Sequence, residues 1–545
     1  MLAALGFFAV VATSPAQAEV NLVRLTPEQY ERSIHDIFGA NIRIDTNNVD
    51  PGFRDGGLLA IGNRKLTLSV AALERDDALM QQVAAQVADP RRRDVLIGCR
   101  PRSEHSADDR CAGSFIARVG FPLFRRPLSH AEIQGYVATQ HHAAEQRHSF
   151  TAGIAAALAE MLVTPDFLFR IERSTRDPAR PDTLQLDAFS RAARLSFFLW
   201  NTTPDRQLLT AAQSGKLMTA RGLEAEIDRL LSSPRLANGV RAFFTDMLAF
   251  GGLDEDPGFD RLAIDASFYP KFTLNAQNSA QEQTLRTIVD HLLRKNGDYR
   301  DLFTTRDTFL TPSLAALYGV PLARSQELGG AVPWVPYRFS DKDPYVGILT
   351  QVSFLSLHSH PGRSSPTRRG KALREIFLCQ RVPPPPGNVD FSVVQNGDDP
   401  RYKTVRQRLT AHRTEPMCAG CHKIMDPIGL SFENFDTASG YRTTENGAPI
   451  DTSGEFASRS VDGVQQLAQL IREDPATTSC LILRAYSYGT ERQPTPQEQT
   501  WLTNLQPALS REGVRWRTLM RHIALNPDFY TLPVSASPPT TAAAQ

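Results

Sequence analysis

Two closely spaced cysteines followed by a histidine are the residues with the clearest chemical meaning in this chain. Cys418, Cys421 and His422 form the segment CAGCH, which holds two of the six cysteines among 545 residues. The CxxCH spacing is the signature of c-type haem attachment, in which both thiols bind the haem and the histidine becomes an axial iron ligand. The sequence therefore predicts one covalent haem c, with Cys418 and Cys421 as the attachment residues and His422 as the proximal ligand.

A zinc ion, a redox dithiol and an inert cysteine pair are the alternatives for this segment. Structural zinc needs four ligands, usually completed by a second CxxC or an HxxxH pair. The other cysteines, however, stand singly at positions 99, 111, 379 and 480 and form no second CxxC pair. A thioredoxin-like dithiol would follow a strand in a βαβ pattern, which the sequence does not show. These comparisons favour haem.

The N-terminal residues predict export. The apolar run Leu2–Ala12 is followed by the small-residue site AQA before Glu19, which is the pattern of a secretory signal peptide over residues 1–18. The run is too short to span a bilayer permanently. The alternative is a buried N-terminal helix. We expect a periplasmic or otherwise exported protein without a transmembrane segment.

The four remaining cysteines suit an oxidising compartment, and they allow three disulfide pairings. We favour Cys99 with Cys111, because these two lie in one local segment, which leaves Cys379 with Cys480. Buried free thiols are the alternative, since cysteine is often buried without forming a disulfide.

The composition and the helical periodicity predict a mainly α, multi-module helical protein, and the CxxCH segment adds to this a small cytochrome c-like haem module. Apolar residues make up 41% of the chain, and the net charge of +1 gives no reason to expect a nucleic-acid partner.

The polar stretch Ser174–Leu184 is predicted as a linker or long loop, and LVTPDFLF (162–169) and ALNPDFYT (524–531) share a helix-then-turn ending. The expected modules are a signal peptide (1–18), an N-terminal helical module (19–90), a helical module with an FRRP motif (91–148), a central helical domain (149–330), the haem module (345–440), a C-terminal helical module (441–533) and a disordered tail (534–545).

Further histidines and arginines precede a polyproline stretch at residues 383–386. His358 or His360 could reach the distal face of the haem, and Arg363 or Arg369 could bind a haem propionate, since arginine forms bidentate bonds to carboxylates. The alternative is that these are hydrogen-bonded or solvated residues at the start of a helix.

A structural role is the favoured interpretation for three of the residues that follow the CxxCH segment. Met425 follows His422 too closely to reach the opposite face of the same iron, so we expect it to pack in the core. Glu433 and Asp436 could act as acid/base groups, but carboxylates in such a position are more often helix caps or ion-pair partners.

Several longer stretches together resemble the multi-domain cytochrome c-like proteins that are abundant in planctomycetes and long catalogued as domains of unknown function. These stretches are LTPEQYERSIHDIFG (25–39), FRRPLSHAEI (124–133), MLVTPDFLFRIE (161–172), RLSFFLWNTTPDRQLL (194–209), SSPTRRGKALREIFLCQRVPPPP (364–386), CAGCHKIMDPIGLSFENFD (418–436) and GAPIDTSGEF (447–456). The resemblance implies an exported protein with a haem on Cys418, Cys421 and His422, and it implies little about a substrate.

The function that we predict is that of an exported monohaem c-type protein. It would transfer electrons to or from a redox partner protein, or act as a haem-dependent oxidoreductase on a small-molecule substrate that the sequence does not identify. The alternative is a binding or scaffold protein in which the haem is mainly structural.

Overall fold

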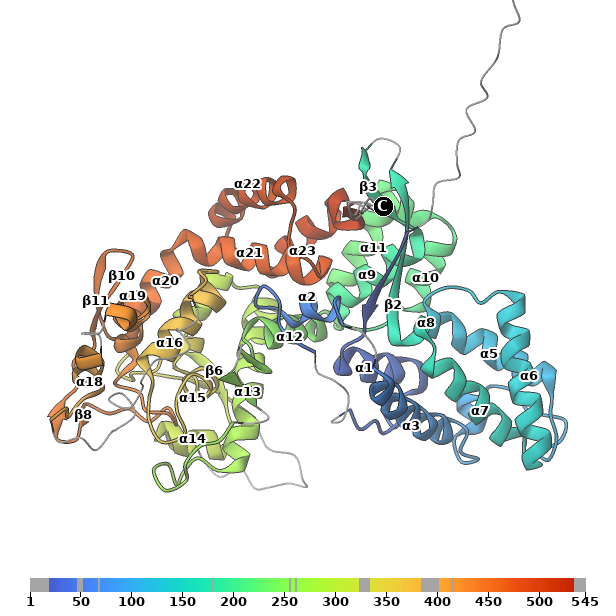
Figure 1. Cartoon of the computed structure of the whole chain (residues 1–545), viewed down its shortest axis with the longest axis horizontal. Helices are drawn as coiled ribbons and strands as arrows, with labels where there is room; N and C mark the ends of the chain where they lie inside the picture. The colour runs from blue at the N-terminus through green and yellow to red at the C-terminus, as the bar shows by residue number, and fades with distance from the viewer. Residues whose placement is uncertain are drawn as a thin grey trace, which may run out of the picture. The chain divides into compact units, whose positions relative to one another are not determined.

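The computed structural model describes residues 19–46, 52–66, 69–177, 180–253, 256–259, 262–322, 334–383, 401–412 and 416–533. The predicted signal peptide and the predicted tail lie outside these residues. The described chain is mainly α-helical, which confirms the predicted fold class (Figure 1). Within the described ranges, no helix is long and apolar enough to cross a membrane.

The chain divides into two compact units. Unit 1 comprises the described residues up to Gly52, Asn63–Leu230 and those from Ala524 onward, and unit 2 comprises Phe53–Gly62 and Leu231–Ile523. The division at Leu230 falls inside the segment 149–330 that the sequence groups as one domain. The finer module limits stay predictions.

Unit 1 is a group of helices with one antiparallel sheet, whose strand order is β1-β2-β3-β12. Its helices are α1 (Pro27–Phe38), α3 (Val70–Val87), α4 (Arg93–Leu96), α5 (Asp109–Phe124), α6 (His130–Arg147), α7 (Phe150–Val163), α8 (Pro165–Leu168), α9 (Ala188–Trp200), α10 (Arg206–Gln213), η1 (Lys216–Met218), α11 (Ala220–Ser232) and η8 (Pro527–Tyr530). Its strands are β1 (Glu19–Arg24), β2 (Phe169–Asp177), β3 (Arg180–Leu186) and β12 (Thr531–Pro533). Apolar side chains from α1, α3, α5 and α7 form its main core, in which Ile34, Met80, Phe115 and Leu158 are fully buried.

The prediction of a linker over Ser174–Leu184 is wrong for the residues that the structure describes, because residues 174–177 belong to β2 and residues 180–184 to its partner strand β3. The buried face of β2 is polar, and burial there is made possible by ion pairs. Glu172 is inaccessible to solvent and accepts a hydrogen bond from the equally buried Arg194 at 2.6 Å. A strand that buries charge carries no apolar alternation, so its sequence resembles a loop.

Unit 2 contains the CxxCH segment. Its helices are α2 (Leu59–Asn63), α12 (Leu236–Met247), α13 (Leu274–Val289), η3 (Asp290–Arg294), η4 (Tyr299–Phe303), α14 (Pro312–Tyr318), η5 (Ile348–Thr350), α15 (Val352–Leu357), α16 (Pro366–Ala372), η6 (Leu373–Phe377), α18 (Val405–His412), α19 (Pro416–Gly429), η7 (Leu430–Phe432), α20 (Gly463–Glu473), α21 (Pro475–Thr490), α22 (Pro496–Glu512) and α23 (Trp516–Leu525). Its strands form four two-stranded hairpins: β4 (Gly252–Leu253) with β5 (Asp256–Pro257), β6 (Asp307–Leu310) with β7 (Val335–Arg338), β8 (Thr444–Glu445) with β9 (Ala448–Pro449), and β10 (Ser453–Phe456) with β11 (Arg459–Asp462).

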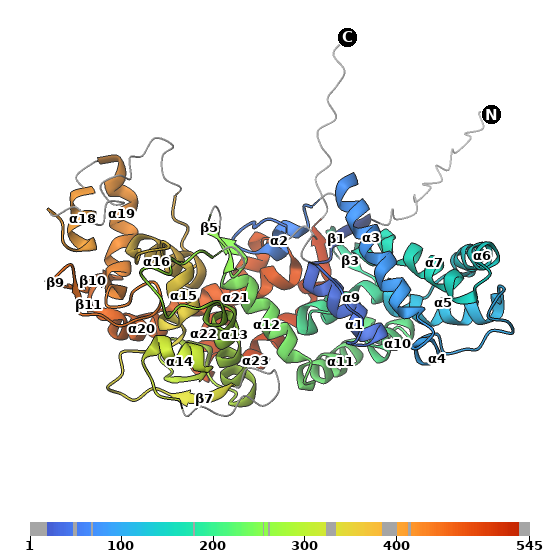
Figure 2. The ribbon, with the colours of Figure 1, turned by 90° about the horizontal axis from the view of Figure 1, so that it is seen from below.

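Helix α19 is held by unusually close contacts with its neighbours, and two of them are with α16 (Figure 2). A Cβ atom on Gly370 of α16 would lie 2.1 Å from the carbonyl oxygen of Met425, and one on Gly429 would lie 1.8 Å from that of Pro366. A Cβ on Gly454 of β10 would lie 1.9 Å from the carbonyl oxygen of Pro427. These distances explain the glycines, since any side chain would force the backbones apart. Met425 itself is buried in the core, as predicted.

Both predicted disulfides are present, Cys99–Cys111 in unit 1 and Cys379–Cys480 in unit 2. The second one closes a segment of the chain that contains α18, α19 and α20.

Two stretches of the chain, from α5 to β2 and from α21 to β12, repeat the same order of elements and the same two turns. Helices α5 and α21 each end at a residue with a left-handed backbone, Arg125 (φ 57°) and Glu491 (φ 53°). In both copies an arginine follows and forms an ion pair with the glutamate that completes the capping box of the next helix: Arg126 with Glu132 at 2.7 Å, and Arg492 with Glu498 at 2.5 Å.

The two copies also end alike. Helix α7 and helix α23 are each followed by a Pro-Asp-Phe turn, which leads into β2 and β12 respectively. Both strands pair with β3 in the sheet of unit 1. The short likeness between residues 162–169 and 524–531 is therefore the end of a longer structural repeat.

Candidate functional site

The CxxCH segment lies in the first half of α19. The backbones of Cys418, Cys421 and His422 are helical, and the side chain of Cys418 lies outside the described residues. The thiol of Cys421 is partly exposed and takes part in no disulfide, and its Sγ lies 4.0 Å from the carbonyl oxygen of Pro383. Cys421 therefore carries a thiol with the chemistry that thioether attachment needs.

The imidazole of His422 is bonded to a buried carboxylate one helical turn later. Its Nδ1 lies 2.9 Å from Oδ2 and 3.1 Å from Oδ1 of Asp426, a side chain with no solvent exposure. The hydroxyl of Thr367 in α16 donates to Oδ1 of Asp426 at 2.9 Å. A proton shared through Nδ1 sets the tautomer in which Nε2 carries the lone pair, and a carboxylate in this place raises the basicity of a metal-binding histidine.

The residues present fit a covalent haem. A cysteine thiol outside any disulfide and an oriented, largely buried imidazole follow each other on one helix, in the CxxCH register. Next to them, a Cβ atom on Gly420 would meet none of the described atoms within 4 Å. Among the residues that the structure describes, no group of three or more His, Cys, Asp or Glu side chains could hold a metal ion.

The two histidines predicted for the distal side differ in burial. His358, at the end of α15, is 2% exposed, and its ring centroid lies 4.9 Å from that of Phe354. Burial lowers the pKa of His358 to about 3, and the positive charges of Arg369 and neighbouring cations act in the same direction. Burial lowers the pKa of His360 to about 4. Both imidazoles are thus neutral at neutral pH, which is the form that binds iron, and their distal role stays a prediction.

The two arginines predicted for the propionates are also placed differently. The guanidinium of Arg369 is fully buried and donates hydrogen bonds to main-chain and hydroxyl oxygens at 2.7–3.3 Å, namely the carbonyls of Leu355, Phe432, Phe435 and Asp436 and the hydroxyl of Ser359. Arg369 therefore joins α15, α16 and the loop after α19. Arg363 is partly exposed, and burial together with Arg408 lowers its pKa. A propionate contact of either residue stays a prediction.

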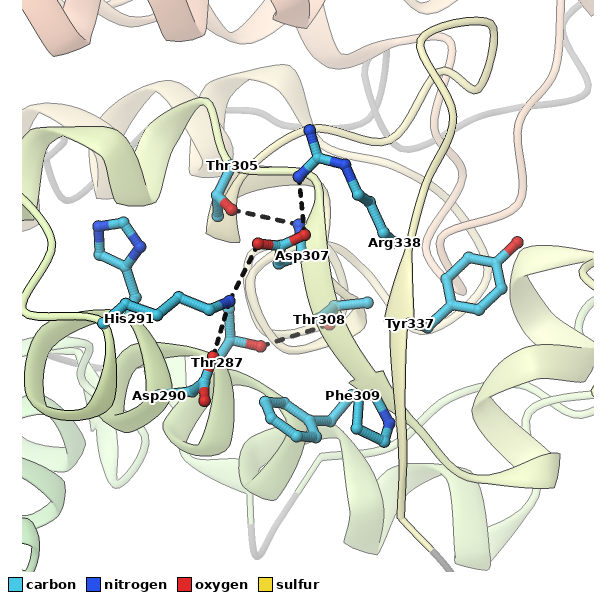
Figure 3. A pocket seen from close by; sticks show the side chains of 11 residues that line it. Thr287, Asp290, His291, Thr305, Asp307, Thr308, Phe309, Tyr337 and Arg338 are labelled. Carbon is cyan, nitrogen blue, oxygen red and sulfur yellow. Dashed lines mark hydrogen bonds and ion pairs between the residues drawn. The ribbon is translucent and has the colours of Figure 1, made fainter.

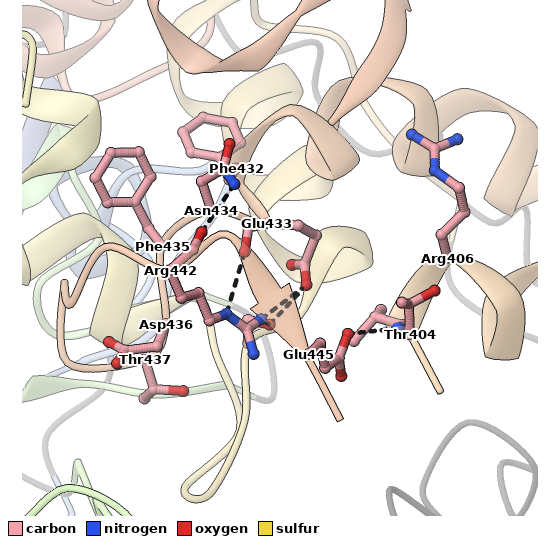
Figure 4. A network of polar contacts seen from close by, with 12 residues as sticks. Thr404, Arg406, Phe432, Glu433, Asn434, Phe435, Asp436, Thr437, Arg442 and Glu445 are labelled. Atoms are coloured by element: carbon pink, nitrogen blue, oxygen red, sulfur yellow. Dashed lines mark hydrogen bonds and ion pairs between the residues drawn. The ribbon is translucent and has the colours of Figure 1, made fainter. Parts of the chain in front are cut away.

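Glu433 forms an ion pair, which is one of the favoured roles, whereas Asp436 accepts hydrogen bonds within a loop. Glu433 is buried and points toward Arg442 (Figure 4), whose Nη2 donates to Oε2 at 3.1 Å, while Ser364 donates at 2.9 Å. Burial raises the pKa of Glu433 despite the nearby positive charges. Oδ1 of Asp436 accepts hydrogen bonds from the main-chain NH groups of Ala438 and Gly440, which fixes the loop.

A polar pocket of about 220 Å³ lies between α13, η3 and the β6–β7 hairpin (Figure 3). Lys295 bridges its two carboxylates, with Nζ 2.8 Å from Asp290 and 3.0 Å from Asp307, and Arg338 lies 2.7 Å from Asp307. Both carboxylates are thus paired with cations.

Asp426 and Thr367 are the functional candidates that the sequence reasoning missed. The spacing of four residues between His422 and Asp426 was a usable signal, because such residues share one face of a helix. Thr367 has no comparable signal, since only the packing of α16 on α19 brings it to the carboxylate.

Three family models match parts of the chain. PSD5, described as Protein of unknown function (DUF1595), matches residues 111–172, and PSD4, Protein of unknown function (DUF1592), matches 186–320. PSCyt3, Protein of unknown function (DUF1588), matches 346–445 and so includes the whole of α19. Neither a curated protein nor a solved structure matches the chain. The three matches are consistent with the planctomycete-type multi-domain cytochrome c-like family that the sequence resembles, and their descriptions assign no activity.

Proposed function

We propose that this chain is an exported monohaem c-type protein that transfers electrons or acts as a haem-dependent oxidoreductase. Cys418 and Cys421 would hold the haem through thioether bonds, and His422 would be the proximal ligand. The observation that carries the proposal is the bond from His422 to buried Asp426, on the helix where the Cys421 thiol is outside any disulfide. Bound haem c supplies one-electron redox chemistry.

The protein residues would hold the attachment helix in place. Thr367 fixes the carboxylate of Asp426, and this carboxylate orients the ring of His422. Arg369 fixes the loop after α19 through its carbonyl contacts. A metal ligand that is held by packed helices and by hydrogen bonds to its own side chain keeps its geometry when the charge of the bound group changes.

On the distal side, His358 is the stronger of the two histidine candidates. Its imidazole is buried and neutral, and it lies beside Phe354, whose ring contacts that of Phe432 in the segment directly after α19. His360 is the second candidate, and Arg363 and Arg369 remain the candidates for the propionates. Replacing the true distal ligand by phenylalanine would convert a low-spin spectrum to a high-spin one, and the same change at the other histidine would leave the spectrum unchanged.

Export is part of the proposal. Two disulfides agree with an oxidising compartment, where such bonds form and persist. N-terminal sequencing of protein secreted by a bacterial host should find Glu19 as the first residue. Intact Met1 on cytoplasmic protein would contradict export.

Haem attachment is tested by co-expression with a cytochrome c maturation system. The purified protein should keep one haem after denaturation, measured by mass and by the pyridine haemochrome spectrum. Cys421→Ser should weaken attachment, whereas Gly420→Ala, at a position where the added methyl group meets nothing within 4 Å, should preserve it. A wild-type protein that folds and matures without haem would overturn the proposal.

The alternative, a binding or scaffold protein with a structural haem, differs in its redox behaviour. A redox-active protein should take up and release one electron reversibly and exchange electrons with a small soluble cytochrome used as the probe. A haem that stays in one oxidation state under these conditions would favour the scaffold.

A further inference from the structure

The pair His422–Asp426 is placed against the usual preferences of a helix. Asp426 lies in the last turn of α19, where the helix dipole disfavours a negative charge. It also follows its partner by four residues, whereas a stabilising pair places the acidic residue before the basic one. Helix stability therefore does not explain a carboxylate here.

The charge of Asp426 is also poorly compensated. The side chain has no solvent exposure, and among the described residues its ion pair is with His422, not with a lysine or arginine. Thr367 contributes a neutral hydroxyl group. A buried carboxylate needs a partner that supplies charge or protons, and the ring NH of His422 is the group in contact with it.

The position of Asp426 is fixed by the contact between two helices. Thr367 directly follows Pro366, whose carbonyl oxygen lies against Gly429, and Gly370 lies one turn further along α16, against the backbone of α19. The packing of α16 against α19 therefore fixes the hydroxyl of Thr367 relative to the carboxylate of Asp426. A residue that orients a metal ligand requires such support.

We infer that Asp426 is a positioning and charge-donating residue that lowers the reduction potential of a haem bound to His422. This inference rests on the proposed function. A carboxylate that shares the Nδ1 proton makes Nε2 a stronger donor, and a stronger donor favours ferric over ferrous iron. Thr367 moderates the effect, because its hydrogen bond withdraws charge from the same carboxylate.

The two residues therefore act in opposite directions, which gives a sharp test by redox titration of the haem-loaded protein. Asp426→Asn should shift the ratio of ferric to ferrous protein at a fixed potential at least tenfold toward ferrous, which raises the one-electron potential by about 59 mV. Thr367→Val, which removes the hydroxyl donor and keeps the shape, should lower the potential. The NMR shifts of the His422 ring protons in the oxidised protein should move in both variants.

Glu445→Gln is the matched control. Glu445 is a largely buried carboxylate within the same family match, but its partner is Arg408 instead of an iron ligand. Its replacement should change the ratio less than threefold, so a specific effect of Asp426 is separated from a general effect of removing a charge.

The outcomes are separable. If the wild type binds haem and Asp426→Asn changes the potential no more than Glu445→Gln does, the inference is wrong and the proposed function stands. If Asp426→Asn fails to mature, Thr367→Val decides, because an unchanged or raised potential overturns the inference. A wild type without haem overturns the proposed function and the inference together.

Discussion

The disulfide Cys379–Cys480 should contribute more to stability than Cys99–Cys111. The two bonds join cysteines that are 101 and 12 residues apart, respectively. The loss of loop-closure entropy in the unfolded chain grows with the logarithm of this separation, so the expected contributions are about 4.7 and about 3 kcal/mol. The difference of about 2 kcal/mol is the quantity to measure.

The double variants Cys379→Ala/Cys480→Ala and Cys99→Ala/Cys111→Ala are suited to this measurement. Each removes two sulfur atoms and leaves no unpaired thiol that could react with Cys418 or Cys421. The bonds lie in different units, so each variant should destabilise mainly its own unit. Urea titration followed by hydrogen exchange and mass spectrometry reports the free energy of unfolding for peptides of each unit.

Losses in the reverse order, or losses of equal size, would refute the reasoning from loop length. The wild type treated with a thiol reductant is a second reference, because it removes the same bonds without changing any residue. Agreement between the reduced wild type and the alanine variants would show that the covalent bond, and not the packing of the sulfur atoms, makes the difference.

Three further predictions concern α16, α19 and the loop that follows α19. Gly370→Ala should destabilise unit 2 by about 1–3 kcal/mol in urea titration, because its methyl group would lie 2.1 Å from a carbonyl oxygen of α19. The control Gly420→Ala should be neutral or stabilising. Equal effects of the two variants would contradict the close-packing argument. Arg369→Met should cost about 3 kcal/mol or more, since it leaves buried carbonyl oxygens without donors, and Arg369→Lys should not rescue the loss if the fork geometry is what matters. Burial raises the pKa of Glu433, so the folded state loses stability as pH rises from 4.5 through that raised pKa. Over this range the free energy of unfolding of Glu433→Gln should therefore rise relative to that of the wild type, by at most about 1.4 kcal/mol per pH unit. Parallel pH profiles of the two proteins would show that the carboxylate stays ionised beside Arg442.

The sequence could predict those features that depend on local patterns. Helical periodicity gave the mainly α fold, and the spacing of four cysteines gave a disulfide pairing that the structure contains. The expectation that Met425 packs in the core followed from its distance to His422, and the structure confirms it. In each case the prediction depends on residues that are close in the sequence or, for the cysteines, on a choice among three possible pairings.

Features that combine distant segments could not be predicted in this way. Arg369 was named as a candidate for a propionate because arginine suits carboxylates, but its contacts with carbonyl oxygens of α15 and of the loop after α19 had no signal in the sequence. The segment 174–184 was assigned to a loop because it is polar and contains proline, whereas its described residues continue a strand that buries charge at Glu172. Both features depend on tertiary contacts of polar groups, which leave no period in the sequence.

The structural repeat shows a third limit. Only the Pro-Asp-Phe turn is similar enough in sequence to be noticed, because it needs particular residues at adjacent positions. The helices between the capping box and this turn need only an apolar face, which many sequences provide. The left-handed residue is Arg125 in one copy and Glu491 in the other, so the backbone conformation is kept while the residue type is not.

The supports of α19 favour a redox role of the proposed haem over a structural one. A structural haem needs attachment and an apolar surrounding, but it does not need a buried carboxylate on its ligand, whose burial costs free energy. In this chain the buried carboxylate of Asp426 accepts a hydrogen bond from the hydroxyl of Thr367. The helix that carries Asp426 contacts α16 and β10 closely at three glycines. If the proposed haem binds, this arrangement would control the donor strength of His422, and donor strength matters to a haem iron that changes its charge. Under that proposal the contacts of His422 would favour electron transfer over a structural role, whereas CxxCH specifies attachment alone.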